Sequence, residues 1–241
     1  MRWHRLMKPN FISGATKRFL DLFFPPVCVS CGKILPYGAE PYLCPECRKK
    51  WEEERCLRIK EVRSPKNDLL RILTVCDYDA SKNSPSVGKA VLLRLKEEPL
   101  HYAADFIAAE LVGTLSWLPF PLHNCVVTGA PRSRQGIREN GFDQVRLISK
   151  CFARHIGAEY IPLLANVGNI RQKELAYSGR FRNASHSYRF RGKYSEMLYG
   201  ADVILIDDVS TTGATLMSCA KILMEEGAGR VFGISFAGTV M

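Results

Sequence analysis

Two adjacent acids in the stretch VILIDDVSTTGATL (203–216) are the residues best suited to chemistry in this sequence. Asp207 and Asp208 end a run of aliphatic residues, and ligands of open α/β sheets bind beyond the carboxyl ends of such strands. The small residues and hydroxyls that follow allow backbone N–H groups to converge on an anion where a helix begins. The stretch therefore combines acceptors for hydroxyl groups with a cradle for phosphate, and a sugar phosphate needs both.

A second interpretation of this stretch needs no ligand. The aspartates then cap a helix, and the loop is an ordinary turn from strand to helix. The sequence contains neither the GKS or GKT of a Walker A loop nor the GxGxxG of a dinucleotide site, so these two nucleotide-binding patterns are excluded. An acidic pair without Lys or Arg nearby in the sequence favours the ligand-binding interpretation.

Four cysteines form another pattern with chemical meaning. They lie in two CxxC pairs that are separated by twelve residues: Cys28, Cys31, Cys44 and Cys47. Zinc prefers four ligands in a tetrahedron, and each CxxC turn supplies two thiolates. The spacing predicts a closed, structural zinc site that replaces the hydrophobic core which about sixty residues can barely build. The alternative is a set of free thiols in a core.

The chain is basic, with 34 Lys and Arg against 24 Asp and Glu and a net charge of +10. Such a charge favours polyanionic partners or phosphorylated ligands, and it does not select a fold. Beside the cysteines, Lys49, Lys50 and Trp51 are suited to phosphates and a stacked base of single-stranded DNA. The alternative is a solvated helix face with one packed tryptophan, and we favour that interpretation.

Hydropathy and cysteine usage predict the compartment. No run of eighteen apolar residues occurs, so we expect no membrane span. The amino-terminal region lacks the pattern of a secretory signal. Paired CxxC spacing without an export signal favours metal thiolates and reduced thiols over disulfides, and we therefore expect a cytoplasmic protein.

The elements that must position these residues follow from composition. It changes near residue 60, which predicts a zinc-ribbon module over 1–60 and a second domain over 67–241. In the second part, nearly all-apolar strands alternate with helices, and this predicts an α/β fold with a parallel sheet covered on both faces. We expect strands at 72–79, 123–131, 202–208 and 230–237, and helices at 84–98, 100–118, 143–157 and 216–227, the third helix capped by Asp143 and Gly157.

Several stretches resemble known families. VILIDDVSTTGATL closely resembles the motif with which type I phosphoribosyltransferases bind phosphoribosyl pyrophosphate (PRPP). FLDLFFPPVCVSCG (19–32) with LCPEC (43–47) resembles the start of the ComF family, which joins a zinc ribbon to such a domain. APRSRQGIRENGFDQ (130–144) and RQKELAYSGRFRN (171–183) are similar to two further stretches of that family. The resemblance implies a type I phosphoribosyltransferase fold, a parallel sheet flanked by helices, behind a small zinc ribbon.

The resemblance also implies a PRPP site with catalytic acids. Asp207 and Asp208 would accept hydrogen bonds from the ribose hydroxyls of PRPP, and one of them would stabilise positive charge on the ring. The residues after them would complete PRPP binding and hold the 5-phosphate: Val209, Ser210, Thr211, Thr212, Gly213, Ala214 and Thr215.

Two basic segments are implied to hold the pyrophosphate. The loop with Arg132, Ser133 and Arg134 would approach the pyrophosphate, with Mg²⁺ bridging. Arg180 and Arg182 lie in a segment that resembles a flexible loop, and they would close over the leaving group and expel water.

Two functions remain open. One is enzymatic: a Mg²⁺-dependent transfer of the phosphoribosyl group from PRPP to a nucleophile, with displacement of pyrophosphate. The other is a non-catalytic role in competence, DNA uptake or recombination. There the PRPP site is a sensor or platform, and the ribbon contacts single-stranded DNA or DNA-processing proteins. Similar domains commonly pair, so a homodimer is compatible with either function, and the sequence names no acceptor.

Overall fold

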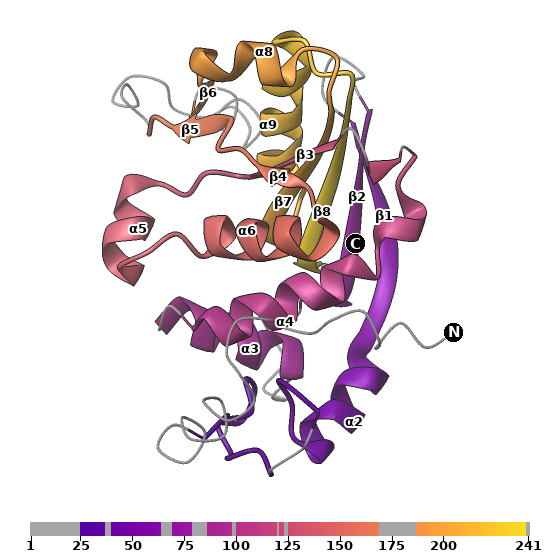
Figure 1. Cartoon of the computed structure of the whole chain (residues 1–241), viewed down its shortest axis with the longest axis vertical. Helices are drawn as coiled ribbons and strands as arrows, with labels where there is room; N and C mark the ends of the chain where they lie inside the picture. Colours follow the sequence, from indigo (N-terminus) through magenta and orange to yellow (C-terminus); the bar gives the residue numbers. More distant parts are fainter. Residues whose placement is uncertain are drawn as a thin grey trace.

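The centre of the computed structural model is a six-stranded sheet with the strand order β1-β2-β8-β7-β3-β4 (Figure 1). The five strands β2, β8, β7, β3 and β4 run parallel to one another. Strand β1, at one edge, is antiparallel to β2. The strands are β1 (Arg55–Arg63), β2 (Leu69–Asp77), β3 (Cys125–Gly129), β4 (Glu159–Tyr160), β7 (Asp202–Ser210) and β8 (Arg230–Gly238). The structure describes residues 25–36, 40–63, 69–78, 86–97, 100–119, 121–122, 125–168 and 187–239.

Helices and a small second sheet surround these strands. The helices are α2 (Pro45–Glu54), α3 (Val87–Glu97), α4 (His101–Val112), α5 (Arg134–Asn140), α6 (Gln144–Ile156), α8 (Ser195–Leu198) and α9 (Ala214–Glu225). The second sheet pairs β5 (Leu164–Asn166) with β6 (Tyr188–Phe190). None of the described helices combines the length and the apolar composition that crossing a bilayer requires.

The central strand β7 is buried on both faces, as its aliphatic run predicts. Ile204 and Ile206 belong to a core shared with α3, α4 and α6. Val203 and Leu205 belong to a second core shared with α9, β5 and β6. This alternation is the two-residue period of a strand, and a parallel sheet covered on both faces produces it. The predicted α/β fold with a helix-flanked parallel sheet is confirmed.

Helix α6 begins and ends where its caps predict. The carboxylate of Asp143 accepts a hydrogen bond from the N–H of Arg146 at 3.0 Å. Gly157 ends the helix in the left-handed conformation, with φ of 68°. Because α6 packs against β3 and β7, these caps fix the position of its first turn at the sheet edge.

The predicted helix 100–118 is shorter in the structure. Helix α4 ends at Val112, and a 3₁₀ turn over Leu115–Trp117 follows. Between them, the hydroxyl of Thr114 donates to the carbonyl of Leu111 at 2.6 Å. A hydroxyl bonded to the backbone of the preceding turn competes with regular helix, which explains the break.

Strand β1 is an element that the sequence did not predict. Its charged run RCLRIKEVR has the composition of an exposed edge strand, where charges prevent unwanted pairing. Ion pairs to β2 join Arg58 to Asp77 at 2.8 Å and Glu61 to Arg71 at 3.1 Å. The strand crosses the expected boundary near residue 60, so the division of the chain into 1–60 and 67–241 stays a prediction.

The zinc-ribbon region and the sheet share one core through Trp51, which is 1% exposed. Its ring stacks on Phe236 of β8 with centroids 5.4 Å apart, and it meets the edge of Phe106 of α4 at 5.5 Å. A buried ring cannot stack on a nucleic-acid base. The favoured interpretation of one packed tryptophan is confirmed, and the alternative in which Trp51 stacks on a base is wrong, because α2 uses this ring to pack on the sheet.

A partly buried acid joins the ribbon to two helices. Asp105 of α4 accepts hydrogen bonds from the hydroxyl of Tyr42 at 2.7 Å and from Arg154 of α6 at 2.7 Å, and His155 lies 2.9 Å away. Burial alone would raise the pKa of Asp105, but hydrogen bonds to His155 and Tyr42 lower it to about 2. The ionised carboxylate thus stabilises the contact between the ribbon, α4 and α6.

Trp51→Ala is expected to lower the free energy of unfolding by about 3–5 kcal/mol, because it leaves a cavity between α4 and β8. Urea denaturation followed by circular dichroism measures the loss. Trp117→Ala is the matched control, since Trp117 is 53% exposed and its removal should cost less than about 0.5 kcal/mol. Equal losses in the two variants would contradict a core shared by the ribbon and the sheet.

Candidate functional site

The acidic pair lies at the carboxyl end of β7 and is buried. Asp207 is 8% exposed and Asp208 is 4% exposed. The N–H of Asp208 donates to Oδ1 of Asp207 at 2.9 Å, and the N–H of Val209 donates to Oδ1 of Asp208 at 2.8 Å. These local bonds hold both carboxylates at the sheet edge, as the strand position predicts.

Two side chains from neighbouring elements contact Asp208. Nη1 of Arg132, in the loop after β3, donates to Oδ2 of Asp208 at 3.2 Å. Nε2 of Gln144, in the first turn of α6, donates to the same oxygen at 3.2 Å. Strand β3 pairs directly with β7, which is why its loop reaches the acids. Gln144 ends the stretch 130–144 that resembles the ComF family, but sequence reasoning gave it no role.

Burial dominates the electrostatics of Asp207. It raises the pKa of this carboxyl well above the ordinary value, and the neighbouring charge of Asp208 raises it further. The Arg132 guanidinium opposes this shift. Two buried acids with one close cation favour ligands that bring hydroxyl donors or further positive charge to the carboxylates.

The loop from Ser210 to Thr215 connects the acids to α9. Gly213 has φ of 77°, and a Cβ there would lie 2.6 Å from Cγ2 of Val62 and 2.9 Å from Cδ1 of Ile72. Conformation and space therefore both require glycine. The N–H of Ala214 donates to Oγ1 of Thr212 at 3.3 Å. The loop thus brings the first turn of α9, whose N–H groups have no intrahelical acceptor, beside the acids.

The exposed and buried sides of this loop differ. Thr211 and Thr212 are exposed, while Gly213 is buried. The carbonyl of Thr211 accepts hydrogen bonds from Nζ of Lys60 at 2.7 Å and from Oγ1 of Thr239 at 2.9 Å. Oγ of Ser210 is buried and has no hydrogen-bond partner among the described residues. A buried hydroxyl without a partner at the start of the loop is consistent with a group that a ligand satisfies.

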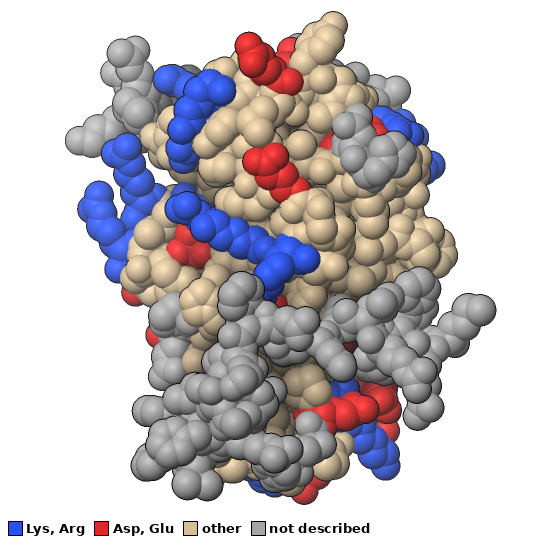
Figure 2. All heavy atoms as spheres, in the orientation of Figure 1, with Lys and Arg blue, Asp and Glu red and all other residues tan. Residues whose placement is uncertain are grey.

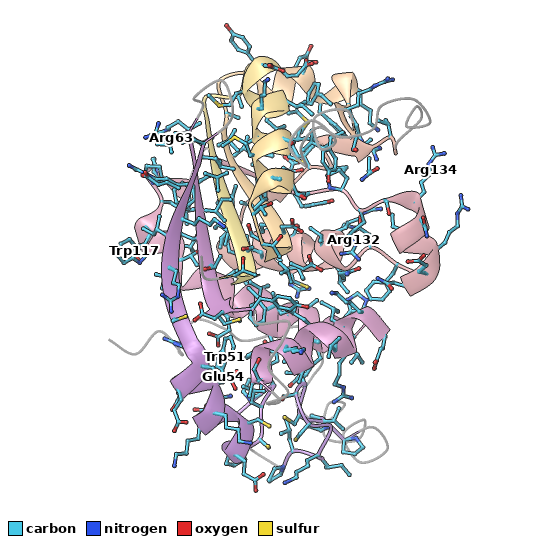
Figure 3. All side chains as sticks on the ribbon, turned by 180° about the vertical axis from the view of Figure 1, so that it is seen from behind. Trp51, Glu54, Arg63, Trp117, Arg132 and Arg134 are labelled. Atoms are coloured by element: carbon cyan, nitrogen blue, oxygen red, sulfur yellow. The ribbon has the colours of Figure 1, made fainter. Side chains whose placement is uncertain are left out.

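The structure brings one residue of the expected pyrophosphate loop, Arg132, to the acids and leaves the others away from them. Arg132 reaches the acids, whereas Oγ of Ser133 accepts from the N–H of Gly136 and caps α5. Figure 3 shows Arg132 turned toward the sheet and Arg134 pointing away from it. Arg180 and Arg182 lie outside the described residues, so their expected closure over the leaving group stays a prediction.

A cleft of about 840 Å³ opens beside Arg132, between α6 and the second sheet. Cationic side chains outnumber acidic ones in the lining of this cleft. Among the described residues, Asp143 is the one acid that lines it. Five of the six cations form no ion pair within the described part of the chain, and the sixth, Arg132, is paired with Asp208. Figure 2 shows Lys and Arg side chains gathered on this face. The cations that line the cleft are Arg132, Arg134, Arg146, Lys150, Arg191 and Lys193. Of these, Arg191 donates a hydrogen bond to the carbonyl of Leu164 at 3.1 Å.

The four predicted zinc ligands come together in the ribbon. Their sulfur atoms lie within 4.8 Å of one another, and Sγ of Cys31 lies 3.7 Å from Sγ of Cys44. Tetrahedral zinc with Zn–S bonds of about 2.3 Å has S···S edges of about 3.8 Å, so the cluster fits the metal. No disulfide joins any of the cysteines among the described residues. Cys28 and Cys47 complete the set, and four protein ligands leave no open position, which makes the zinc structural.

Comparison with known proteins agrees with this geometry. Residues 19–67 match the family model of a double zinc ribbon domain. The competence protein ComFC of Bacillus subtilis is 27% identical over 228 residues, which cover 92% of this chain and 88% of that protein. The resemblance to the ComF family is confirmed. The similarity to that protein extends over both the ribbon and the sheet.

Solved structures similar to this chain include two enzymes. Adenine phosphoribosyltransferase from Saccharomyces cerevisiae is 14% identical with a TM-score of 0.40, over 82% of this chain and 90% of that one. The allosteric regulatory enzyme of purine biosynthesis is 18% identical with a TM-score of 0.38. That match covers 56% of this chain and 25% of the enzyme, so the chain spans about a quarter of its length. These scores are too low for an argument about function.

Replacing Cys44 and Cys47 by serine is expected to abolish zinc binding and to cost several kcal/mol of stability, because the ligands lie in the shared core. Metal content by mass spectrometry and urea unfolding measure the two effects. Cys56→Ser is the control, since Cys56 lies outside the cluster and should leave one zinc per chain. Retention of zinc by the double variant would contradict the four-sulfur site.

Asp207→Asn tests the buried charge without changing the shape of the side chain. A raised pKa means that ionisation destabilises the folded state as pH rises above about 3.9, the ordinary value of an unfolded aspartate. We expect the variant to be more stable than the native protein at pH 7. This difference in the free energy of unfolding should vanish at about pH 3. Urea unfolding at several pH values measures this difference.

Asp202→Asn is the control for that experiment. Asp202 lies at the other end of β7 and forms an ion pair with Arg230 at 2.7 Å, so its replacement should bring no gain at pH 7. An Asp207→Asn variant less stable than the native protein at pH 7 would contradict the buried charge.

Proposed function

We propose that this protein binds PRPP together with Mg²⁺ at the carboxyl end of β7. The observation that carries the proposal is the buried pair Asp207 and Asp208 placed directly before a small-residue loop and the start of α9. The carboxylates suit the two ribose hydroxyls, and the loop suits the 5-phosphate. Arg132, which already contacts Asp208, lies where the pyrophosphate would extend.

The same geometry supports phosphoribosyl transfer. In that reaction the bond from C1 of ribose to pyrophosphate breaks, a bond from C1 to a nucleophile forms, and pyrophosphate leaves with the electron pair. The carboxylates of Asp207 and Asp208 would hold the ribose and stabilise positive charge on its ring. They are also the hard oxygen ligands of the site, and Mg²⁺ bound beside them would neutralise charge on the pyrophosphate.

A role in competence is part of the proposal. The relative from Bacillus subtilis is named a competence protein, and its similarity covers 92% of this chain. We place this chain in the same process, DNA uptake or recombination. With PRPP bound, it would act there as an enzyme or, in the second form of the proposal, as a sensor.

The second candidate function is binding of single-stranded DNA, and the basic cleft favours it. Arg146, Lys150 and Lys193 line the cleft without ion-pair partners among the described residues, and Tyr160 and Tyr194 offer aromatic rings. Unpaired cations beside rings are the usual means of binding a flexible polyanion. This contact lies beside the sheet and not on the ribbon, where Trp51 is buried.

Calorimetry with PRPP and Mg²⁺ tests the first candidate. The native protein is expected to bind with a saturable heat, and the double variant Asp207→Asn/Asp208→Asn to lose at least about tenfold in affinity, because charged hydrogen bonds to the diol are lost. Asp202→Asn, at the opposite end of β7, should bind as the native protein does. No heat with native, zinc-loaded protein would contradict PRPP binding.

Turnover is measured separately by release of pyrophosphate. With a panel of amines and bases as acceptors, an enzyme is expected to release pyrophosphate with at least one of them, and the double acid variant with none. Tight PRPP binding without release for any acceptor would contradict catalysis and favour the sensor.

Fluorescence anisotropy with a single-stranded 20-mer tests the second candidate. Arg146→Gln/Lys150→Gln is expected to weaken binding, and to reduce the slope of log K against log salt by about 1.4, since each phosphate contact contributes about 0.7. Lys49→Gln/Lys50→Gln on α2 removes the same charge outside the cleft and should leave the slope unchanged. If Lys49→Gln/Lys50→Gln weakens DNA binding more than Arg146→Gln/Lys150→Gln does, the DNA binds on the ribbon and not in the cleft.

A further inference from the structure

Lys60 connects the edge strand β1 to the phosphate loop, although 151 positions of sequence separate it from Thr211. Its Nζ donates to the carbonyl of Thr211 at 2.7 Å. The hydroxyl of Thr239, just after β8, donates to the same carbonyl at 2.9 Å. Two donors from different elements therefore fix the orientation of this peptide at the start of the loop.

A second residue of β1 supports the loop from the same side. Val62 packs so close to Gly213 that a Cβ at position 213 would lie 2.6 Å from its Cγ2. Lys60 and Val62 are two residues apart, so their side chains leave β1 on the same face. Strand β1 therefore forms one wall of the loop that connects β7 to α9.

The ammonium of Lys60 has no carboxylate partner among the described residues. It is partly buried, and burial lowers the pKa of Lys60. A partly buried cation bonded to a neutral carbonyl is stabilised further when a dianion binds nearby. At the same loop, the buried hydroxyl of Ser210 also lacks a partner in the described part of the chain. Both groups are suited to one phosphate monoester.

We propose that Lys60 is a further binding residue of the 5-phosphate site: its ammonium holds the Thr211 peptide and compensates the charge of the phosphate monoester. The inference rests on the proposed binding of PRPP. It adds to the loop a cation that comes from another part of the chain, which the loop sequence Ser210–Thr215 does not itself contain.

The zinc ribbon positions this lysine. Helix α2 begins directly after Cys44 and continues at Glu54 into β1. Trp51 anchors α2 on β8, and the carboxylate of Glu54 accepts the N–H of Val87 at 2.7 Å at the start of α3 (Figure 3). The strand that carries Lys60 is thus held at its start by the ribbon and along its length by β2. Strand β1 therefore connects the ribbon to the proposed PRPP site.

Calorimetry with ribose 5-phosphate, PRPP with Mg²⁺, and Mg²⁺-pyrophosphate tests the inference on full-length, zinc-loaded protein. Lys60→Gln is expected to weaken ribose 5-phosphate and PRPP about tenfold, because one charge-assisted contact is lost. Binding of Mg²⁺-pyrophosphate should not change, since that group lies at Arg132. Lys60→Arg should restore most of the affinity, because it restores the charge.

Lys50→Gln is the matched control, since it removes the same charge from an exposed position on α2 and should leave all three affinities unchanged. Equal binding of ribose 5-phosphate by native protein and Lys60→Gln would overturn the inference and leave PRPP binding intact. An equal loss in Lys60→Gln and Lys60→Arg would also overturn it, because charge would then be irrelevant. Failure of the native protein to bind PRPP would instead contradict the proposed function.

Discussion

Two buried carboxylates side by side at the end of β7 are the constraint on which the rest of the site depends. Burial disfavours the charged form of Asp207, and the neighbouring charge of Asp208 raises the cost of ionising it. Oδ2 of Asp208 accepts hydrogen bonds from Arg132, in the loop after β3, and from Gln144, in the first turn of α6. This requires β3 to lie next to β7 and α6 to begin at Asp143. In the proposed complex the hydroxyls of a sugar would add donors to these carboxylates, each of whose Oδ1 atoms already accepts a backbone N–H.

The loop after the acids shows how distant parts of the chain form one site. Gly213 has no room for a side chain because Val62 and Ile72 pack against it, so the edge strand β1 shapes the loop. The zinc ribbon holds β1 through α2 and Trp51. The four-cysteine site therefore supports more than the ribbon, because it also holds the strand that borders the loop between β7 and α9. The single core that runs from the cysteines to Phe236 is the physical basis of this connection.

Patterns of short range predicted much of this arrangement. The aliphatic run of β7, the caps of α6 and the two CxxC pairs each depend on neighbouring residues, and the structure confirms them. The sequence did not predict β1, because its charges resemble those of a linker. It favoured a packed Trp51 but could not name the partners of the ring, which lie on α4 and β8. Contacts such as Lys60 with Thr211 exist only after the sheet has formed. Sequence reasoning likewise could not show that Arg134 points away while Arg132 turns inward.

The most direct test of the central claim is a crystal structure of the protein with PRPP and Mg²⁺. The account predicts both ribose hydroxyls at about 2.5–3.0 Å from carboxylate oxygens of Asp207 and Asp208. It predicts the 5-phosphate at the N–H groups of residues 211–215. A sugar bound elsewhere, with the acids still bonded only to Arg132 and Gln144, would contradict the account.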